Sequence, residues 1–255
     1  MRRMVVQPSR GRIWPLLAML GAALAAAVLL SAPPASASGL ASGDYTLRHM
    51  TFPADPLTDA FGARPVMPLD VKRSGKWMDV LRRQEAEAQG PATPCRDTGA
   101  DQCFQTFWNQ TVAMLKTLPR AEQVRQVNDL VNKMGYWSDW DLYREADHWA
   151  TPEEMFYKGG GDCEDFALFK YFLLRAAGVP AEDMRLTLVA YNDQAHLVGL
   201  VMVDGSPMVL DCIVLKTMPP EEMKQYQAVY SLSETSAWLL ASDRSDQATM
   251  VQASR

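Results

Sequence analysis

The hydrophobic positions of the chain change from a helical to a strand-like period near residue 183. Between residues 77 and 177, apolar side chains recur at intervals of three and four, the spacing of one helix face. The predicted helices cover Trp77–Gln89, Phe104–Leu118, Arg120–Met134 and Cys163–Ala177. We expect the first of them to be short and exposed. Pro119, Gly135 and Gly178 follow the other three, and these residue types end helices.

The helix predicted at 163–177 differs from the others in its polarity. From Phe166 to Ala177, the charged residues are Lys170 and Arg175 alone. A helix that is apolar nearly all round is typical of a position at the centre of a core.

The later part of the chain predicts an antiparallel sheet. Runs rich in β-branched residues lie at Met184–Ala190, His196–Val203 and Met208–Val214. Asp204-Gly205 between the last two is a strong hairpin signal. Beyond Leu215 the pattern becomes polar and helical. The predicted class is therefore α+β: a helical N-terminal part with a central buried helix packed on an antiparallel sheet.

The N-terminal segment predicts export. Four arginines precede the apolar run Leu16–Leu30, and Ala35-Ser36-Ala37 offers a small-residue cleavage site. An uncleaved anchor is the alternative, but the run is short for a bilayer span and Pro33-Pro34 ends it. No later segment is long and apolar enough to cross a membrane. We expect a signal peptide at 1–37, an irregular arm with a cysteine loop at 38–103, a catalytic domain at 104–240 and a flexible tail at 241–255.

Charge and cysteine content narrow the class of protein. The net charge of -5 becomes more negative by four when the arginine-bearing leader is removed. This acidity argues against a nucleic-acid surface, which needs clustered basic residues. Export to the periplasm places the cysteines in an oxidising space. Cys95 and Cys103 in a turn-rich stretch therefore predict a small-loop disulfide rather than a metal site.

Cys163 is the candidate nucleophile. It follows three glycines and Asp162, which is a natural N-cap. The free N–H groups and the dipole at a helix start favour a thiolate and can bind an oxyanion. The alternative is a small apolar side chain that happens to begin a helix.

His196 and Asp211 are the candidate base and its orienting acid. If Asp204-Gly205 forms the turn, Val198 lies opposite Asp211, and His196 is two residues away on the same face. An acid in an apolar strand needs a partner, and a histidine would supply one. A purely structural pair is the alternative. Cys212 is expected on the opposite face, in the core.

Asp162, Glu164 and Asp165 surround the candidate nucleophile. Acids at a helix start are often a solvated cap. Three carboxylates so close together would nevertheless oppose a thiolate unless a cation neutralised them, and Ca²⁺ takes several oxygen ligands.

The run from Val127 to Pro180, which contains GDCEDFA, resembles the bacterial transglutaminase-like cysteine proteinases, as do the downstream HLVGLV and PMVLDCI. The resemblance implies a papain-like, transglutaminase-like fold. It also implies a triad of Cys163, His196 and Asp211, and calcium held by Asp162, Glu164 and Asp165. The family pattern reads Asn after VLD, where this chain has Cys212.

The resemblance also implies a biological setting. Family members of the best-known type are periplasmic proteases that cut a large surface adhesin and so control biofilm attachment. An inner-membrane receptor for cyclic di-GMP sequesters them. From the residues alone, acyl transfer to an amine through the same thioester remains an alternative, as does an inactive calcium-dependent binding module.

Overall fold

The computed structural model describes residue 52, residues 54–90 and residues 103–242. The predicted signal peptide at 1–37 lies outside these residues, and so does Cys95 of the predicted disulfide. Both stay predictions. Within the described segments, no helix combines the length and the apolar character needed to cross a bilayer.

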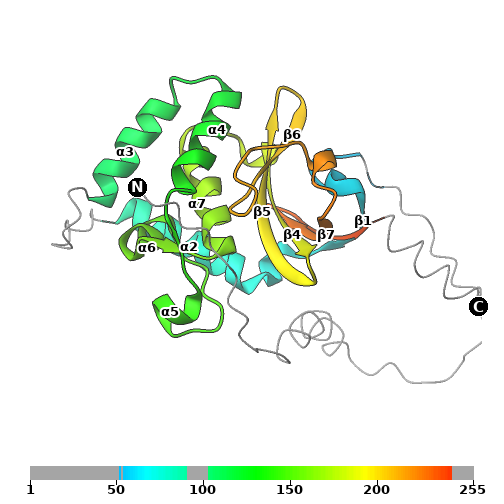
Figure 1. The fold of residues 1–255 in the computed structure, drawn as a ribbon, viewed down its shortest axis with the longest axis horizontal. Helices are drawn as coiled ribbons and strands as arrows, with labels where there is room; N and C mark the ends of the chain where they lie inside the picture. The colour runs from blue at the N-terminus through cyan, green and yellow to red at the C-terminus, as the bar shows by residue number, and fades with distance from the viewer. Residues whose placement is uncertain (1–51, 53, 91–102, 243–255) are drawn as a thin grey trace, which may run out of the picture. The chain divides into compact units, whose positions relative to one another are not determined.

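The described residues form six α-helices, whose arrangement Figure 1 shows. They are α2 (Gly75–Gln89), α3 (Phe104–Leu115), α4 (Arg120–Val131), α5 (Asp139–Tyr143), α6 (Pro152–Lys158) and α7 (Cys163–Ala176). The four predicted helices are confirmed, with α3 and α4 each ending three residues early. Pro119 is the N-cap of α4, where its missing N–H group costs nothing.

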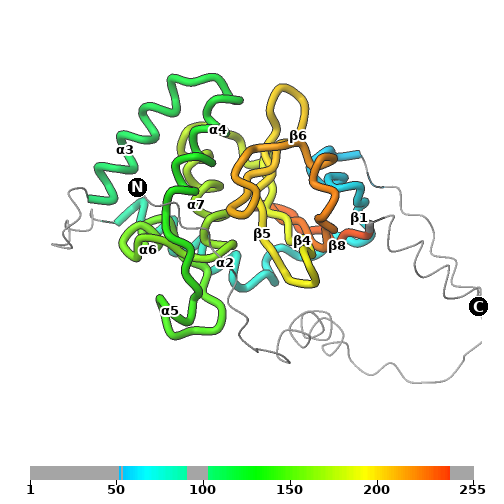
Figure 2. The backbone as a smooth tube through the Cα atoms, viewed as in Figure 1, coloured from blue at the N-terminus to red at the C-terminus, as the bar shows by residue number. Residues whose placement is uncertain are grey.

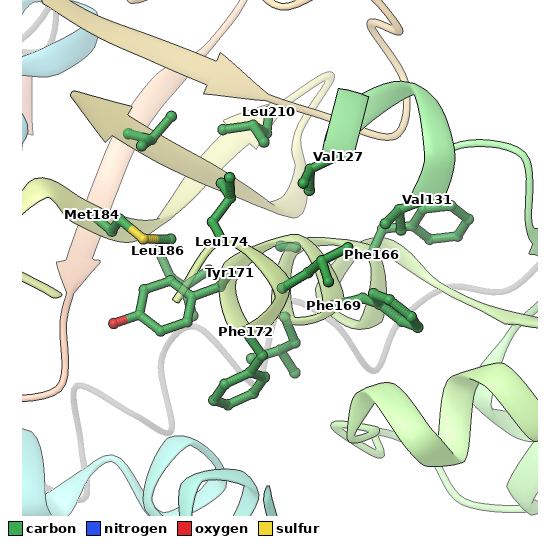
Figure 3. Packing of buried hydrophobic residues seen from close by; sticks show 14 of the residues in the cluster. Val127, Val131, Phe166, Phe169, Tyr171, Phe172, Leu174, Met184, Leu186 and Leu210 are labelled. Carbon is green, nitrogen blue, oxygen red and sulfur yellow. The ribbon is translucent and has the colours of Figure 1, made fainter. Parts of the chain in front are cut away.

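Helix α7 is the centre of the core. Every residue from Asp165 to Leu174 is buried. Figure 3 looks along this helix and shows Leu174 directed towards Leu210 of the sheet, with Phe172 on the opposite side. There the Phe172 ring stacks on Trp77 of α2, with 6.0 Å between the ring centroids. The prediction of a central buried helix is confirmed.

The sheet has six strands, all paired antiparallel, in the order β1-β8-β7-β4-β5-β6 (Figures 1 and 2). The strands are β1 (Ala63–Leu69), β4 (Met184–Tyr191), β5 (Gln194–Val203), β6 (Ser206–Leu210), β7 (Gln227–Leu232) and β8 (Ala237–Ser242). A separate two-residue parallel pair joins β2 (Gly135–Tyr136) to β3 (Gly160–Gly161).

The hairpin between β5 and β6 has the predicted register. Val203 pairs with Ser206, and the ladder continues to Gly199 opposite Leu210. Asp204 and Gly205 take φ values of 50° and 83°, as a tight hairpin turn requires. The next position along the ladder would place Val198 opposite Asp211.

Two segments differ from the prediction. The arm at 38–103 is not irregular throughout, because it contains β1, which pairs with β8. Pro65 and Pro68 obscured this strand, and they are tolerated because β1 lies at the sheet edge. The segment beyond Leu215 is not helical in the main, since it carries β7 and β8. The sheet therefore extends beyond the predicted 104–240 domain, and β8 includes the first two residues assigned to the tail.

The helix predicted to be exposed, α2, is anchored in the core. Trp77 is fully buried, and its indole Nε1 donates to the backbone oxygen of Ser233 at 2.9 Å. The sequence predicted the C-terminal end of α2 correctly and its start two residues late. The burial of Trp77, which the sequence did not predict, anchors the helix in the core.

We expect Trp77→Ala to lower the free energy of unfolding by about 4 kcal/mol, because it leaves a large cavity in the core. Trp140→Ala is the matched control: Trp140 is 61% exposed, so its loss should change stability by less than about 0.5 kcal/mol. Urea unfolding measures both, and equal losses would contradict the assigned burial.

Candidate active site

Cys163 is the first residue of α7, with Asp162 as its N-cap. The two glycines of β3 precede this turn, and neither position has room for a side chain. A Cβ on Gly160 would lie 1.9 Å from the backbone oxygen of Gly135, and one on Gly161 would lie 2.2 Å from Asp165 Oδ2. The glycines therefore let the chain pass close to its neighbours just before the thiol.

The surroundings of the Cys163 thiol oppose its ionisation. The thiol is half-buried and donates to Glu164 Oε2 at 3.0 Å. Burial raises its pKa well above the usual value, the negative charges of Glu164 and Asp162 raise it further, and the backbone N–H of Leu197 lowers it. The helix start alone does not give a thiolate here, contrary to the simplest expectation.

His196 and Asp211 are brought together as the hairpin register predicts. His196 Nε2 lies 2.8 Å from Asp211 Oδ1, and both side chains are buried. Helix α7 packs against β5, and the backbone N–H of Leu197, the neighbour of His196 on that strand, lowers the pKa of the Cys163 thiol. The imidazole therefore lies on a strand that packs against α7, and its carboxylate partner Asp211 lies just beyond the end of β6. With Nε2 engaged, Nδ1 is the ring nitrogen that remains to exchange a proton with a thiol.

Asp211 is kept ionised by three donors. Besides His196, the backbone N–H of Ile213 donates to Oδ1 at 2.9 Å and the Tyr226 hydroxyl donates to Oδ2. Burial alone would raise the pKa of Asp211, but these hydrogen bonds and the charge of His196 hold it below its ordinary value. Tyr226 was not found by sequence reasoning, because it lies in the segment wrongly predicted to be helical.

Cys212 is half-buried and packs against the core, but it does not face away from His196 and Asp211, so that part of the prediction is wrong. Its sulfur is within 4.8 Å of a ring nitrogen of His196 and of a carboxylate oxygen of Asp211. Strand β6 ends at Leu210, so the alternation of faces no longer applies two residues later. Burial, followed by the charge of Asp211, raises the pKa of Cys212 to about 12, so its thiol is protonated at neutral pH.

The predicted acids Asp162, Glu164 and Asp165 form part of a larger carboxylate group. Asp139 of α5 shares one subset of it with Asp162 and Asp165, and another with Asp147 and Glu164. In each subset the candidate ligand atoms lie within 4.8 Å of one another. The sequence analysis missed Asp139 and Asp147, although the acid-rich stretch SDWDLYREAD was a signal for them.

The electrostatics of this carboxylate group fit a hard cation. The buried oxygens Asp139 Oδ1, Asp147 Oδ1 and Asp162 Oδ1 have no hydrogen-bond partner among the described residues. Burial and neighbouring charges raise the pKa of Asp162 to about 9 and that of Asp165 to about 8. Unpartnered oxygens and mutually repelling carboxylates are what a divalent ion with oxygen ligands would relieve.

Residues 90–245 match the model of the family described as bacterial transglutaminase-like cysteine proteinases. The chain belongs to this family. It is therefore a cysteine peptidase of transglutaminase-like type, and the resemblance predicted from its motifs is confirmed. No curated protein sequence matches the chain closely enough to count as a relative.

Solved structures similar to this peptidase include LapG of Legionella pneumophila. Its calcium-bound form is 31% identical, with 62% of this chain and 87% of that chain covered and a TM-score of 0.49. Its EGTA-treated form is 30% identical, with 65% and 91% covered and the same TM-score. A cysteine protease described as putative, from Cytophaga hutchinsonii, is 14% identical, with 72% and 61% covered and a TM-score of 0.35.

We expect Tyr226→Phe to lower the free energy of unfolding at neutral pH by about 2 kcal/mol, because it leaves an oxygen of a buried carboxylate without its donor. Tyr230→Phe is the control, since it removes a hydroxyl that meets the neutral Ser74 hydroxyl instead. Its loss should be smaller in a urea titration. Equal stability of Tyr226→Phe and the unmodified peptidase would show that the hydroxyl does not support Asp211.

Proposed function

We propose that the chain is a periplasmic, calcium-dependent cysteine endopeptidase in which Cys163 is the nucleophile, His196 the base and Asp211 the orienting acid. The observation that carries the proposal is the buried hydrogen bond between His196 and Asp211. His196 lies on β5, which packs against the helix that begins with Cys163. Nucleophile, base and orienter are thereby supplied from three separate elements that pack together.

The reaction follows the chemistry of a thiol peptidase. His196 Nδ1 takes the proton of Cys163 as the sulfur attacks the scissile carbonyl carbon. Backbone N–H groups at the start of α7 bind the oxyanion. The imidazolium, stabilised by Asp211, gives its proton to the leaving amine, and a thioester remains. Water activated by His196 then hydrolyses the thioester and restores the thiol.

Asp139, Asp147, Asp162, Glu164 and Asp165 are the residues that would hold calcium. Bound calcium would supply positive charge beside the carboxylates that otherwise raise the pKa of the nucleophile. The donor set consists of carboxylate oxygens, which calcium prefers. The similar LapG has been solved in a calcium-bound form, which supports the assignment.

The proposed substrate is a large secreted adhesin, whose cleavage would control biofilm attachment. This proposal rests on the family resemblance and on the export signal predicted at 1–37. The same basis suggests an inner-membrane cyclic di-GMP receptor as a partner that sequesters the peptidase.

We expect Cys163→Ala to abolish cleavage of the N-terminal segment of the adhesin from the same organism, because it removes the sulfur that attacks the scissile carbonyl. Cys212→Asn is the matched control: it removes the neighbouring thiol and should retain cleavage. Mass spectrometry of the products distinguishes cut chains from cross-linked ones. Undiminished cleavage by Cys163→Ala would remove the nucleophile from the proposal, and cross-linked products would indicate acyl transfer.

We expect calcium to raise the melting temperature of the peptidase, because an ion that binds only the folded state stabilises it. Asp147→Asn should reduce this shift, because it removes one charged ligand. Asp141→Asn, on the same segment but outside the carboxylate group, is the control and should keep the shift. Differential scanning fluorimetry with calcium or EGTA measures the melting temperature of all three proteins. A calcium-induced shift in Asp147→Asn as large as that of the unmodified peptidase would exclude Asp147 as a ligand.

A further inference from the structure

Lys170 is a buried cation two helical turns beyond Cys163 on α7. Its side chain is 1% exposed. Its Nζ donates to Asn132 Oδ1 at 2.7 Å and to the backbone oxygen of Asp211 at 2.9 Å. Among the described residues, no carboxylate is hydrogen-bonded to it. A buried lysine is usually paired with an acid. That Lys170 instead donates its hydrogen bonds to a side-chain amide and a backbone carbonyl therefore needs an explanation.

Asn132, just after α4, binds the same carbonyl. Its Nδ2 donates to the backbone oxygen of Asp211 at 2.9 Å, while its Oδ1 accepts from Lys170. The three groups form a closed ring of hydrogen bonds that occupies both lone pairs of the Asp211 carbonyl. Such a ring fixes the peptide group more firmly than either bond alone.

The backbone at Asp211 is not held by strand pairing with β5. The ladder between β5 and β6 ends at the pair Gly199–Leu210, so Asp211 lies just beyond the strand. Its side chain must nevertheless keep a fixed orientation to bind the imidazole of His196.

Helix α7 carries both the nucleophile and this support. Cys163 and Lys170 are seven residues apart on one helix, or about 10 Å along its axis. A rigid helix therefore sets the position of the thiol and of the Asp211 carbonyl together.

We propose that Lys170 and Asn132 are positioning residues of the peptidase, which hold the Asp211 carbonyl and thereby the orientation of the His196–Asp211 pair towards Cys163. The inference rests on the triad proposed above. It adds two residues that do not touch the substrate and that act through Asp211.

The charge of Lys170 supports this assignment. Burial lowers the pKa of Lys170 to about 8, while the neighbouring Cys212 and Asp211 act in the opposite direction, so the side chain remains largely protonated at neutral pH. The other close group is the Phe166 ring, 5.7 Å from Nζ to the centroid. Burying a cation without a hydrogen-bonded acid costs stability, and methionine would pack there without that cost.

The test compares Lys170→Met and Asn132→Ala with Asn128→Ala. Asn128 is a matched control on the same helix face one turn earlier, because its Nδ2 donates to the Leu215 carbonyl at 2.6 Å in the same loop but away from Asp211. The probe is hydrolysis of p-nitrophenyl acetate in the presence of calcium, with kcat and KM measured separately. Hydrolysis of this small ester depends on the triad and does not require a peptide-binding surface. The melting temperatures of the three variants and of the unmodified peptidase are also measured.

We expect Lys170→Met to lower kcat about tenfold or more with KM nearly unchanged, because the orienting acid is no longer held in register. Its melting temperature should be equal or higher. Asn132→Ala should show the same split between kcat and KM, which keeps the test decisive if Lys170→Met does not fold. Asn128→Ala should lose stability and keep its kcat.

Two outcomes would overturn the inference. The first is an unchanged kcat in both Lys170→Met and Asn132→Ala. The second is an equal loss of kcat in Asn128→Ala, which would mean that any anchor of this loop suffices. Failure of the proposed triad itself is distinguishable, because Cys163→Ala would then hydrolyse the ester as fast as the unmodified peptidase.

Discussion

The packing of α7 against β5 is the constraint on which the rest of the structure depends. It brings the first residue of a helix beside a strand that carries a histidine, and nothing local in either segment could do so. Ten consecutive residues of this helix, from Asp165 to Leu174, are buried in the core. The chemistry at its start is therefore tied to the stability of the whole domain.

The arrangement has an electrostatic conflict at its centre. The thiol of Cys163 is placed where a helix dipole favours its ionised form, yet the carboxylates around it raise its pKa. The same carboxylates have buried oxygens without partners. A divalent cation would resolve both difficulties at once, which makes metal binding and nucleophile activation two aspects of one proposed device. Asp139 and Asp147 matter for this reason, since a shared cation would join the segment after β2 to the start of α7.

Sequence reasoning succeeded where the determinant was local and failed where it was not. The apolar surface of α7 correctly predicted a buried helix. The Asp204-Gly205 turn correctly predicted the hairpin and the strand register that brings His196 to Asp211. Strand β1 was missed because its prolines are acceptable only at a sheet edge, which the sequence does not reveal. Strand β7 was missed because it buries Ser231, which meets the Thr187 hydroxyl across the sheet. Tyr226 reaches the site through tertiary packing that no local pattern predicts. Asp139 and Asp147 stand in an acid-rich stretch, but only the packing of that stretch places them beside the start of α7.

The central claim is that the sulfur of Cys163 and the Nδ1 atom of His196 form one reacting pair. The most direct measurement is their separation in a crystal structure of the calcium-loaded protein. The account predicts a distance of about 3.5 Å, with His196 Nε2 still bonded to Asp211. A separation too large for proton transfer, with the imidazole turned away from α7 while calcium is bound, would contradict it.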